Sequence, residues 1–399
     1  MDLISTLTVF GTILGFGAVV GTALGALFAH DKDDPRRTVK RSIITGGTLF
    51  ALIGILILQL FVAPESSILT LIPHVPFPGA TLQACSVTMG DLPHGTKSTF
   101  APTSDPSIDG ITLTIRGGSA LSGPVTVAAS AFDRLNHTTT VVHASNSSQG
   151  IEDVEAGNAD IGISGNFRED DPAAKTSHYF TDLADQVLAI VPFAMVVSPD
   201  IQGTVQNLTS QQLINIYNGA YTNWRQVGGP NETITVVNRA TGSATRNTFE
   251  LFVTRSQSRQ GIGVEENTTA EVLSLVANSN GSIGYAATTS IGGQKPANGP
   301  IASPICINQV IPTKAAITDG RYSFWNFEHL YTNTSLTPEK RIAVEDFLRY
   351  LCDDTYKQNQ LVGSGFLRLS DLQDSVFAAR QVAVGQTVRE CKPSDIPTY

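Results

Sequence analysis

The N-terminal end of the chain contains two long stretches without a charged residue. The first, Ser5 to Ala29, covers 25 residues and the second, Ile43 to Ala63, covers 21. A transmembrane helix needs about 20 predominantly apolar residues, so each stretch is long enough to cross a bilayer. Residues 30–42 between them carry five basic side chains, and short basic loops stay in the cytoplasm. We therefore expect residues 1–64 to form a two-helix transmembrane anchor with a cytoplasmic loop at 30–42.

A cleaved signal peptide is the alternative interpretation of the first stretch. No basic segment precedes it, and it is longer than the apolar core of a usual signal peptide. We therefore expect a two-pass membrane protein whose remaining residues lie on the extracytoplasmic side, with membrane lipid around the anchor.

The remainder of the chain is acidic, with 21 basic and 31 acidic side chains and a net charge of −10. This balance argues against nucleic acid as a partner, because such binding relies on positive charge. Residues 65–110 are rich in Pro, Ser, Thr and Gly, which is typical of a linker or an irregular cover.

All four cysteines fall in this extracytoplasmic part. They allow three pairings, and the sequence does not choose among them. We expect at least one disulfide, since that compartment is oxidising, and no zinc site, because the spacing of Cys and His does not suit one. The cysteines are Cys85, Cys306, Cys352 and Cys391.

From Ile111 onward, short apolar strands alternate with amphipathic helices, one of which we expect at Pro124–Leu135. The apolar run Val187–Ser198, interrupted by Pro192, suits a crossover between two lobes. This alternation predicts an α/β fold with ligand-binding groups at the carboxyl ends of strands. Three strand–helix junctions carry Gly together with Ser or Thr, and backbone N–H groups at helix starts attract anions. Arg239 ends one strand just before such a junction, and a guanidinium is a natural bidentate partner of an oxyanion. The junctions therefore favour a small oxyanion as ligand.

Five segments in this region share the motifs of one family, in that family's order. They are residues 146–150 (NSSQG), 159–164 (ADIGIS), 216–224 (IYNGAYTNW), 236–245 (VVNRATGSAT) and 282–285 (SIGY). The chain from about Ile111 to Ser290 thus resembles the substrate-binding proteins of phosphate ABC transporters, which belong to the type II periplasmic-binding-protein superfamily.

The resemblance implies a two-lobed α/β fold with a hinge and a central cleft in residues 111–399, preceded by the two transmembrane helices. Lobe 1 would comprise about 111–192 and 303–399, and lobe 2 about 193–302. It also implies capture of inorganic phosphate for the permease of an ABC importer, without a metal or cofactor. The binding residues that it implies are Ser119, Ala120 through its backbone N–H, Ser147, Arg239, Ser243, Ala244 and Thr245.

One position departs from the family pattern. Many members have an Asp after the ADxGxS strand, where its carboxylate accepts the proton of hydrogen phosphate, whereas this chain has Gly165 followed by Asn166. Asn166, through its amide oxygen, and Arg168 are therefore further candidate contacts. Because the departure weakens one means of rejecting sulfate, another oxyanion remains an alternative ligand.

The sequence is also compatible with a function other than transport. A membrane-anchored sensor or scaffold could keep the same fold and report to a partner protein. An enzyme is disfavoured, because residues 162–166 miss the final glycine of a nucleophile elbow. The sequence also lacks HExxH, a P-loop lysine and a complete dinucleotide fingerprint.

Overall fold

The computed structural model describes residues 85–95, 102–170, 183–256, 258, 261–294 and 299–397. All of them belong to the second of two compact units, Leu82–Tyr399. The two uncharged stretches and the loop 30–42 lie outside the described residues. Within the described ranges, no helix combines the length and the apolar character needed to cross a bilayer.

Strands and helices alternate along the described chain, as the sequence predicts. The strands are β1 (Thr112–Gly118), β2 (Thr139–Ser145), β3 (Ile161–Ser164), β4 (Leu183–Val197), β5 (Asn207–Leu208), β6 (Thr235–Arg239), β7 (Val264–Glu266), β8 (Ser282–Ala287), β9 (Ser303–Ile307) and β10 (Trp325–Asn333). The helices of the first half are α3 (Ser119–Asn136), α4 (Ser147–Glu155), α5 (Pro199–Gln202), α6 (Ser210–Tyr217) and α7 (Ala244–Phe252). Those that follow are α8 (Thr269–Asn278), α9 (Thr288–Gly292), α10 (Lys314–Thr318), α11 (Pro338–Cys352), α12 (Asp354–Tyr356) and α13 (Asp374–Val384).

Lobe 1 is built on β2, β1 and β3, which are parallel, followed by β10 and the first part of β4. Lobe 2 contains the second part of β4 with β8, β6 and β7, and β9 pairs with β4 and β5. We expected the residues from about 303 onward to belong to lobe 1, and this strand pairing does not match that boundary. Because Met195–Val197 bind Ser303–Ile305 in register, β9 belongs to lobe 2.

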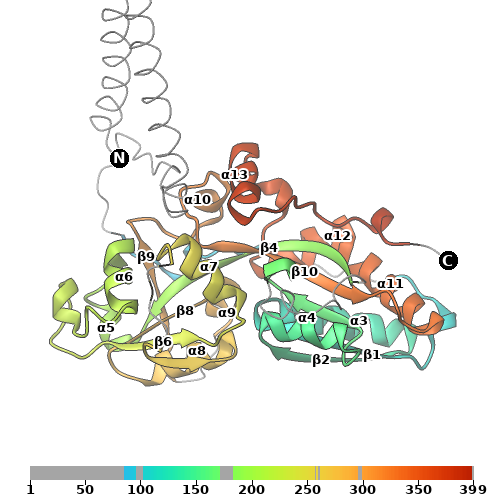
Figure 1. The fold of residues 1–399 in the computed structure, drawn as a ribbon, viewed down its shortest axis with the longest axis horizontal. Coiled ribbons are helices and arrows are strands. Elements are labelled where there is room, and N and C mark those ends of the chain that lie inside the picture. Colours follow the sequence, from blue (N-terminus) through green and yellow to red (C-terminus); the bar gives the residue numbers. More distant parts are fainter. Residues whose placement is uncertain are drawn as a thin grey trace, which may run out of the picture. The chain divides into compact units, whose positions relative to one another are not determined.

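Two long strands connect the lobes. Leu183–Pro192 of β4 pair antiparallel with β10, whereas Phe193–Val197 pair with β8. Figure 1 shows β4 and β10 side by side between the two groups of elements. Every residue of β4 from Val187 to Val197 is buried, as expected for a strand covered on both faces. The change of partner at Pro192 confirms that this apolar run is the crossover between the lobes.

Helix starts are determined by local side-chain caps. The side chain of Asn146 accepts a hydrogen bond from the Gln149 N–H at the start of α4, and Ser243 does the same for Arg246 at the start of α7. The helix that we expected from Pro124 begins earlier, at Ser119, and runs through the proline. This earlier start places Ser119 and Ala120 in the first turn of α3, where backbone N–H groups lack partners within the helix.

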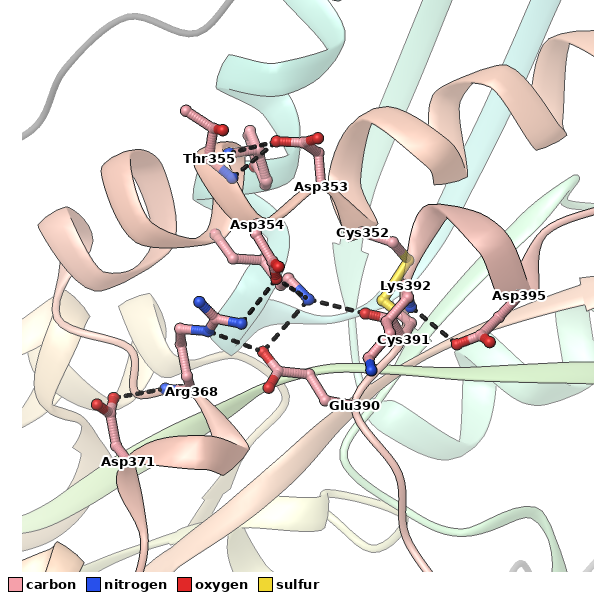
Figure 2. Close-up of polar contacts among 12 residues, drawn as sticks. Cys352, Asp353, Asp354, Thr355, Arg368, Asp371, Glu390, Cys391, Lys392 and Asp395 are labelled. Atoms are coloured by element: carbon pink, nitrogen blue, oxygen red, sulfur yellow. Dashed lines mark hydrogen bonds and ion pairs between the residues drawn. A yellow bond between two sulfur atoms is a disulfide. The ribbon is translucent and has the colours of Figure 1, made fainter.

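Two disulfides are present, Cys85–Cys306 and Cys352–Cys391. The second joins the end of α11 to the C-terminal segment, beside a cluster of ion pairs. In this cluster, the guanidinium of Arg368 lies 2.7 Å from the Asp354 carboxylate and 3.3 Å from that of Glu390. Figure 2 shows both carboxylates facing the guanidinium. The backbone N–H of Cys391 also donates to the Val187 carbonyl oxygen on β4. The C-terminal segment is therefore fixed to the connecting strand.

Candidate binding site between the lobes

Three helix starts meet where the lobes face each other. Ser119 begins α3 after β1, Ser147 begins α4 after β2, and Ala244 begins α7 after β6. The first two belong to lobe 1 and the third to lobe 2. Since N-terminal N–H groups carry partial positive charge, this arrangement can bind an anion without a high density of basic side chains.

The hydroxyl of Ser147 occupies the centre of this arrangement. Its Oγ accepts hydrogen bonds from the backbone N–H groups of Gly165 at 3.3 Å and Ala244 at 3.4 Å. Ser147 itself is buried. Two N–H donors from different lobes therefore point at one oxygen atom, which is the geometry that an oxygen of a bound anion would also satisfy.

Arg239 lies at the end of β6 with only 2% of its surface exposed. Its guanidinium donates to the carbonyl oxygens of Glu266 at 3.3 Å and Asn267 at 2.6 Å. It also donates to the hydroxyls of Thr245 at 3.3 Å and Thr269 at 3.4 Å. Burial lowers the pKa of Arg239 from its usual range.

A second buried arginine on α7 provides a contrast. Arg246 forms ion pairs with Glu250 at 3.0 Å and Glu265 at 2.6 Å. In the part of the chain that the structure describes, Arg239 forms no ion pair within 4 Å and has only neutral hydrogen-bond partners. A buried positive charge without a counter-ion favours binding of an anion, so Arg239 is the natural charge partner for a ligand.

Thr269 joins Arg239 to lobe 1, and the sequence motifs did not identify it. Its hydroxyl accepts from Ser119 Oγ at 3.2 Å, and its N–H donates to the same Ser119 oxygen at 3.0 Å. The signal was present in the sequence as a Thr268–Glu271 capping box at the start of α8. Nothing in the local sequence around Thr268 indicates that this helix start lies opposite Ser119.

The structure brings the predicted residues together at this interface between the lobes. The contacts above join Ser119, Ser147, Arg239, Ala244 and Thr245. Two further predicted residues adjoin them in the chain: Ser243 caps α7, and Ala120 follows Ser119 in the first turn of α3. Ser119 and Ala120 also line a cavity of about 460 Å³, together with Thr289 and Ser290.

Asn166 has a different role from the one we expected. Its amide nitrogen donates to the Gly242 carbonyl oxygen at 3.0 Å, and its amide oxygen accepts from Asn247 at 2.9 Å. Both ends of the amide thus connect the lobes, and its oxygen is already engaged by a protein donor.

The other candidate contact after β3, Arg168, also binds protein groups. Its guanidinium forms an ion pair with the neighbouring Glu169 at 3.4 Å. Its backbone N–H donates to the hydroxyl of Tyr331 on β10 at 3.2 Å. The positive charge of Arg168 is therefore partly compensated by a carboxylate of the protein, in contrast to that of Arg239.

Gly165 lies in a space that a side chain would not fit. A Cβ atom at this position would stand 2.7 Å from the Ala244 Cβ and 3.3 Å from the Phe327 carbonyl oxygen. The first distance is far shorter than a van der Waals contact. The glycine at position 165 thus allows a close approach of the two lobes.

A family model described as the PBP superfamily domain matches residues 98–355, which is more than half of the chain. The phosphate-binding protein PstS of Bacillus subtilis is 28% identical over 262 residues, covering 65% of this chain and 82% of that protein. The protein of the same name from Borreliella burgdorferi is 25% identical over 251 residues, covering 59% of this chain and 82% of that protein.

Solved structures share the fold. A substrate-binding protein assigned to phosphate ABC transport in Clostridium perfringens, crystallised with phosphate bound, matches with a TM-score of 0.54 at 20% identity. The match covers 64% of this chain and 99% of the other. A phosphate-binding protein from Stenotrophomonas maltophilia matches with a TM-score of 0.50 at 13% identity, covering 68% and 93%. The two-lobed α/β architecture and the matched family model together establish that this chain belongs to the PBP superfamily.

Proposed function

We propose that this protein captures inorganic phosphate between its lobes and delivers it to the permease of an ABC importer. The observation that carries the proposal is the buried guanidinium of Arg239, which lies beside two helix starts and has neutral hydrogen-bond partners. The relatives named as phosphate-binding proteins support phosphate as the anion.

The proposed ligand contacts come from both lobes. The guanidinium of Arg239 and the N–H groups of Ala244 and Thr245 would bind phosphate oxygens from lobe 2. The hydroxyls of Ser119 and Ser147 and the N–H of Ala120 would bind from lobe 1. An anion held in this way draws the lobes together, because it takes hydrogen bonds from both.

Equilibrium titration of the purified full-length protein with phosphate, and separately with sulfate, tests this function. We expect saturable binding of phosphate with a stoichiometry of about one per chain, and weaker binding of sulfate. Binding of sulfate in preference to phosphate would replace the proposed ligand by another oxyanion. Binding of neither anion would favour a sensor or scaffold.

We also propose that residues 1–64 anchor the protein in the membrane with the loop 30–42 in the cytoplasm. The two uncharged stretches and the five basic residues between them support this topology. A cysteine introduced at Thr38 should react with a membrane-impermeant thiol reagent only after the cells are permeabilised. Labelling in intact cells would overturn the orientation. The same cells, probed with an antibody against residues 85–399, provide the control for outward exposure.

A further inference from the structure

In the proposed site, the segment after β3 offers no free acceptor for the proton of hydrogen phosphate. Position 165 is a glycine in contact with Ala244, and the amide oxygen of Asn166 already accepts from Asn247. The contacts at Arg239, Ser147 and Ala244 supply donors. A bound hydrogen phosphate would therefore leave its own O–H without a partner unless another group accepts it.

Glu328 is a buried carboxyl group that the site described so far does not use. It lies on β10 with 2% of its surface exposed, and its Oε2 has no hydrogen-bond partner among the described residues. An unpartnered buried carboxyl oxygen is costly. A ligand that supplies the missing hydrogen-bond partner would remove this cost.

The position of Glu328 on β10 directs its side chain to the same face as that of Asn326, which contacts the segment after β3. Side chains two residues apart on a strand point to the same face, and the register shift in β10 occurs only after Glu328. The preceding residue on that face, Asn326, donates through Nδ2 to the Gly165 carbonyl oxygen at 2.6 Å. The N–H of Gly165 in turn donates to Ser147.

Electrostatics connects the same carboxyl group to the other lobe. Burial raises the pKa of Glu328 to about 8, and the positive charge of Arg239 offsets part of that rise. Glu328 is likewise one of the groups that raise the pKa of Arg239 against the effect of its burial. The two side chains are therefore within electrostatic range of each other inside the protein.

We propose that Glu328 contacts the bound anion, accepts the proton of hydrogen phosphate and thereby replaces the carboxylate that is missing at position 165. This inference rests on the proposed function, because it concerns the ligand of the same cleft. Hydrogen phosphate brings an O–H whose hydrogen bond the ionised carboxylate of Glu328 can accept, whereas sulfate brings none and is repelled by that carboxylate. Glu328 thus discriminates between two anions of similar size and charge.

Competitive titration of phosphate against sulfate on the parent and on Glu328→Gln tests the proposal. The titration is best made at about pH 9, above the pKa of Glu328 of about 8, where phosphate still carries one proton. The glutamine keeps the shape of the side chain, but its NH₂ group can donate to sulfate. We expect the preference for phosphate over sulfate to fall at least tenfold, mainly through tighter sulfate binding.

Glu345→Gln is the matched control. Glu345 is another buried glutamate whose Oε2 accepts no hydrogen bond within the described residues. It lies on α11, and this oxygen forms an ion pair with Arg349 at 3.5 Å. The preference for phosphate over sulfate should be the same in Glu345→Gln as in the parent. Glu328→Asp is a second test that retains a carboxylate, and it should keep more of the preference than the glutamine variant does.

The outcomes separate this inference from the proposed function. A parent that binds no phosphate overturns the proposed function and the role of Glu328 with it. A parent that prefers phosphate, together with a Glu328→Gln variant of equal preference, overturns the role of Glu328 alone. Equal weakening of both anions in Glu328→Gln also overturns it, because that result indicates a structural effect without discrimination.

Discussion

The hydroxyl oxygen of Ser147 on lobe 1 accepts a hydrogen bond from the backbone N–H of Ala244 on lobe 2 at 3.4 Å. It accepts a second one from Gly165 at 3.3 Å. Under the proposed function, a phosphate oxygen would take over these two N–H donors from the serine oxygen. Binding would therefore exchange one acceptor for another, and the net gain per hydrogen bond is about 0.5–1.5 kcal/mol for neutral partners. The charged contact at Arg239 therefore has to contribute more to the binding free energy than these neutral hydrogen bonds do.

Arg239→Lys should weaken phosphate binding at least about tenfold, because lysine keeps the charge but loses the planar fork that binds two oxygens at once. The variant should also unfold at a lower temperature, since the fork connects β6 to the carbonyl oxygens of Glu266 and Asn267. Titration and thermal unfolding measure the two effects. The variant Arg225→Lys, at an exposed arginine, serves as the control. Equal phosphate affinities in the parent and in Arg239→Lys would exclude Arg239 from the site.

Gly165→Ala should impair closure of the lobes, because the new Cβ would stand 2.7 Å from the Ala244 Cβ. We expect phosphate affinity to fall while the secondary structure of both lobes, measured by circular dichroism, stays unchanged. Gly203→Ala is the control, since a Cβ at position 203 meets no atom within 4 Å. Full affinity in Gly165→Ala would mean that the bound state holds the lobes further apart than this structure does.

Glu328 should make the stability of the ligand-free protein depend on pH. Its pKa is raised to about 8 in the folded protein by burial, so the unfolded chain releases the proton at lower pH than the folded protein. The folded state then binds more protons over this interval, and stability falls as pH rises from about 4.5 to about 8. The slope contributed is at most about 1.4 kcal/mol per pH unit. The free energy of unfolding, measured with denaturant at several pH values, should depend more steeply on pH in the parent than in Glu328→Gln over this interval. The same pH dependence in both proteins would contradict the raised pKa of Glu328.

The two disulfides should contribute unequally to stability. Cys85 and Cys306 are 221 residues apart, whereas Cys352 and Cys391 are 39 apart. Loop-closure entropy gives about 5 kcal/mol for the first and about 4 kcal/mol for the second. Denaturant unfolding of the variants Cys85→Ser with Cys306→Ser, and Cys352→Ser with Cys391→Ser, measures both contributions. A larger loss of stability on removal of Cys352–Cys391 than on removal of Cys85–Cys306 would show that packing around α11 outweighs chain entropy.

Local chemistry explains which parts of this fold were predictable from the sequence. The caps at Ser243 and Asn146 act within three residues, so the starts of α7 and α4 were recognisable. The crossover at Pro192 was visible because a long apolar run, although interrupted by this proline, is typical of a strand covered on both faces. The start of α3 was placed five residues too late, because Pro124 suggested a boundary that the helix does not respect.

Relationships across long sequence separations were not predictable. The contact of Ser119 with Thr269 joins residues 150 apart, and no local pattern indicates it. The pairing of β9 with β4 and the choice of disulfide partners depend on the same kind of tertiary proximity. Glu328 was missed for another reason. A lone glutamate in an apolar strand becomes informative only when its burial and the absence of a partner for Oε2 among the described residues are known.

The disulfide between Cys85 and Cys306 determines how a mechanical pull on the N-terminal part of the chain is transmitted. Cys85 follows residues 1–84 directly, and Cys306 lies on β9 in lobe 2. Tension applied through the N-terminal residues passes through a covalent bond into β9 before it reaches the segment that leads to β1. If residues 1–64 anchor the protein as proposed, lobe 2 would carry the load from that anchor. A movement of lobe 1 about β4 and β10 would then be shielded from that load.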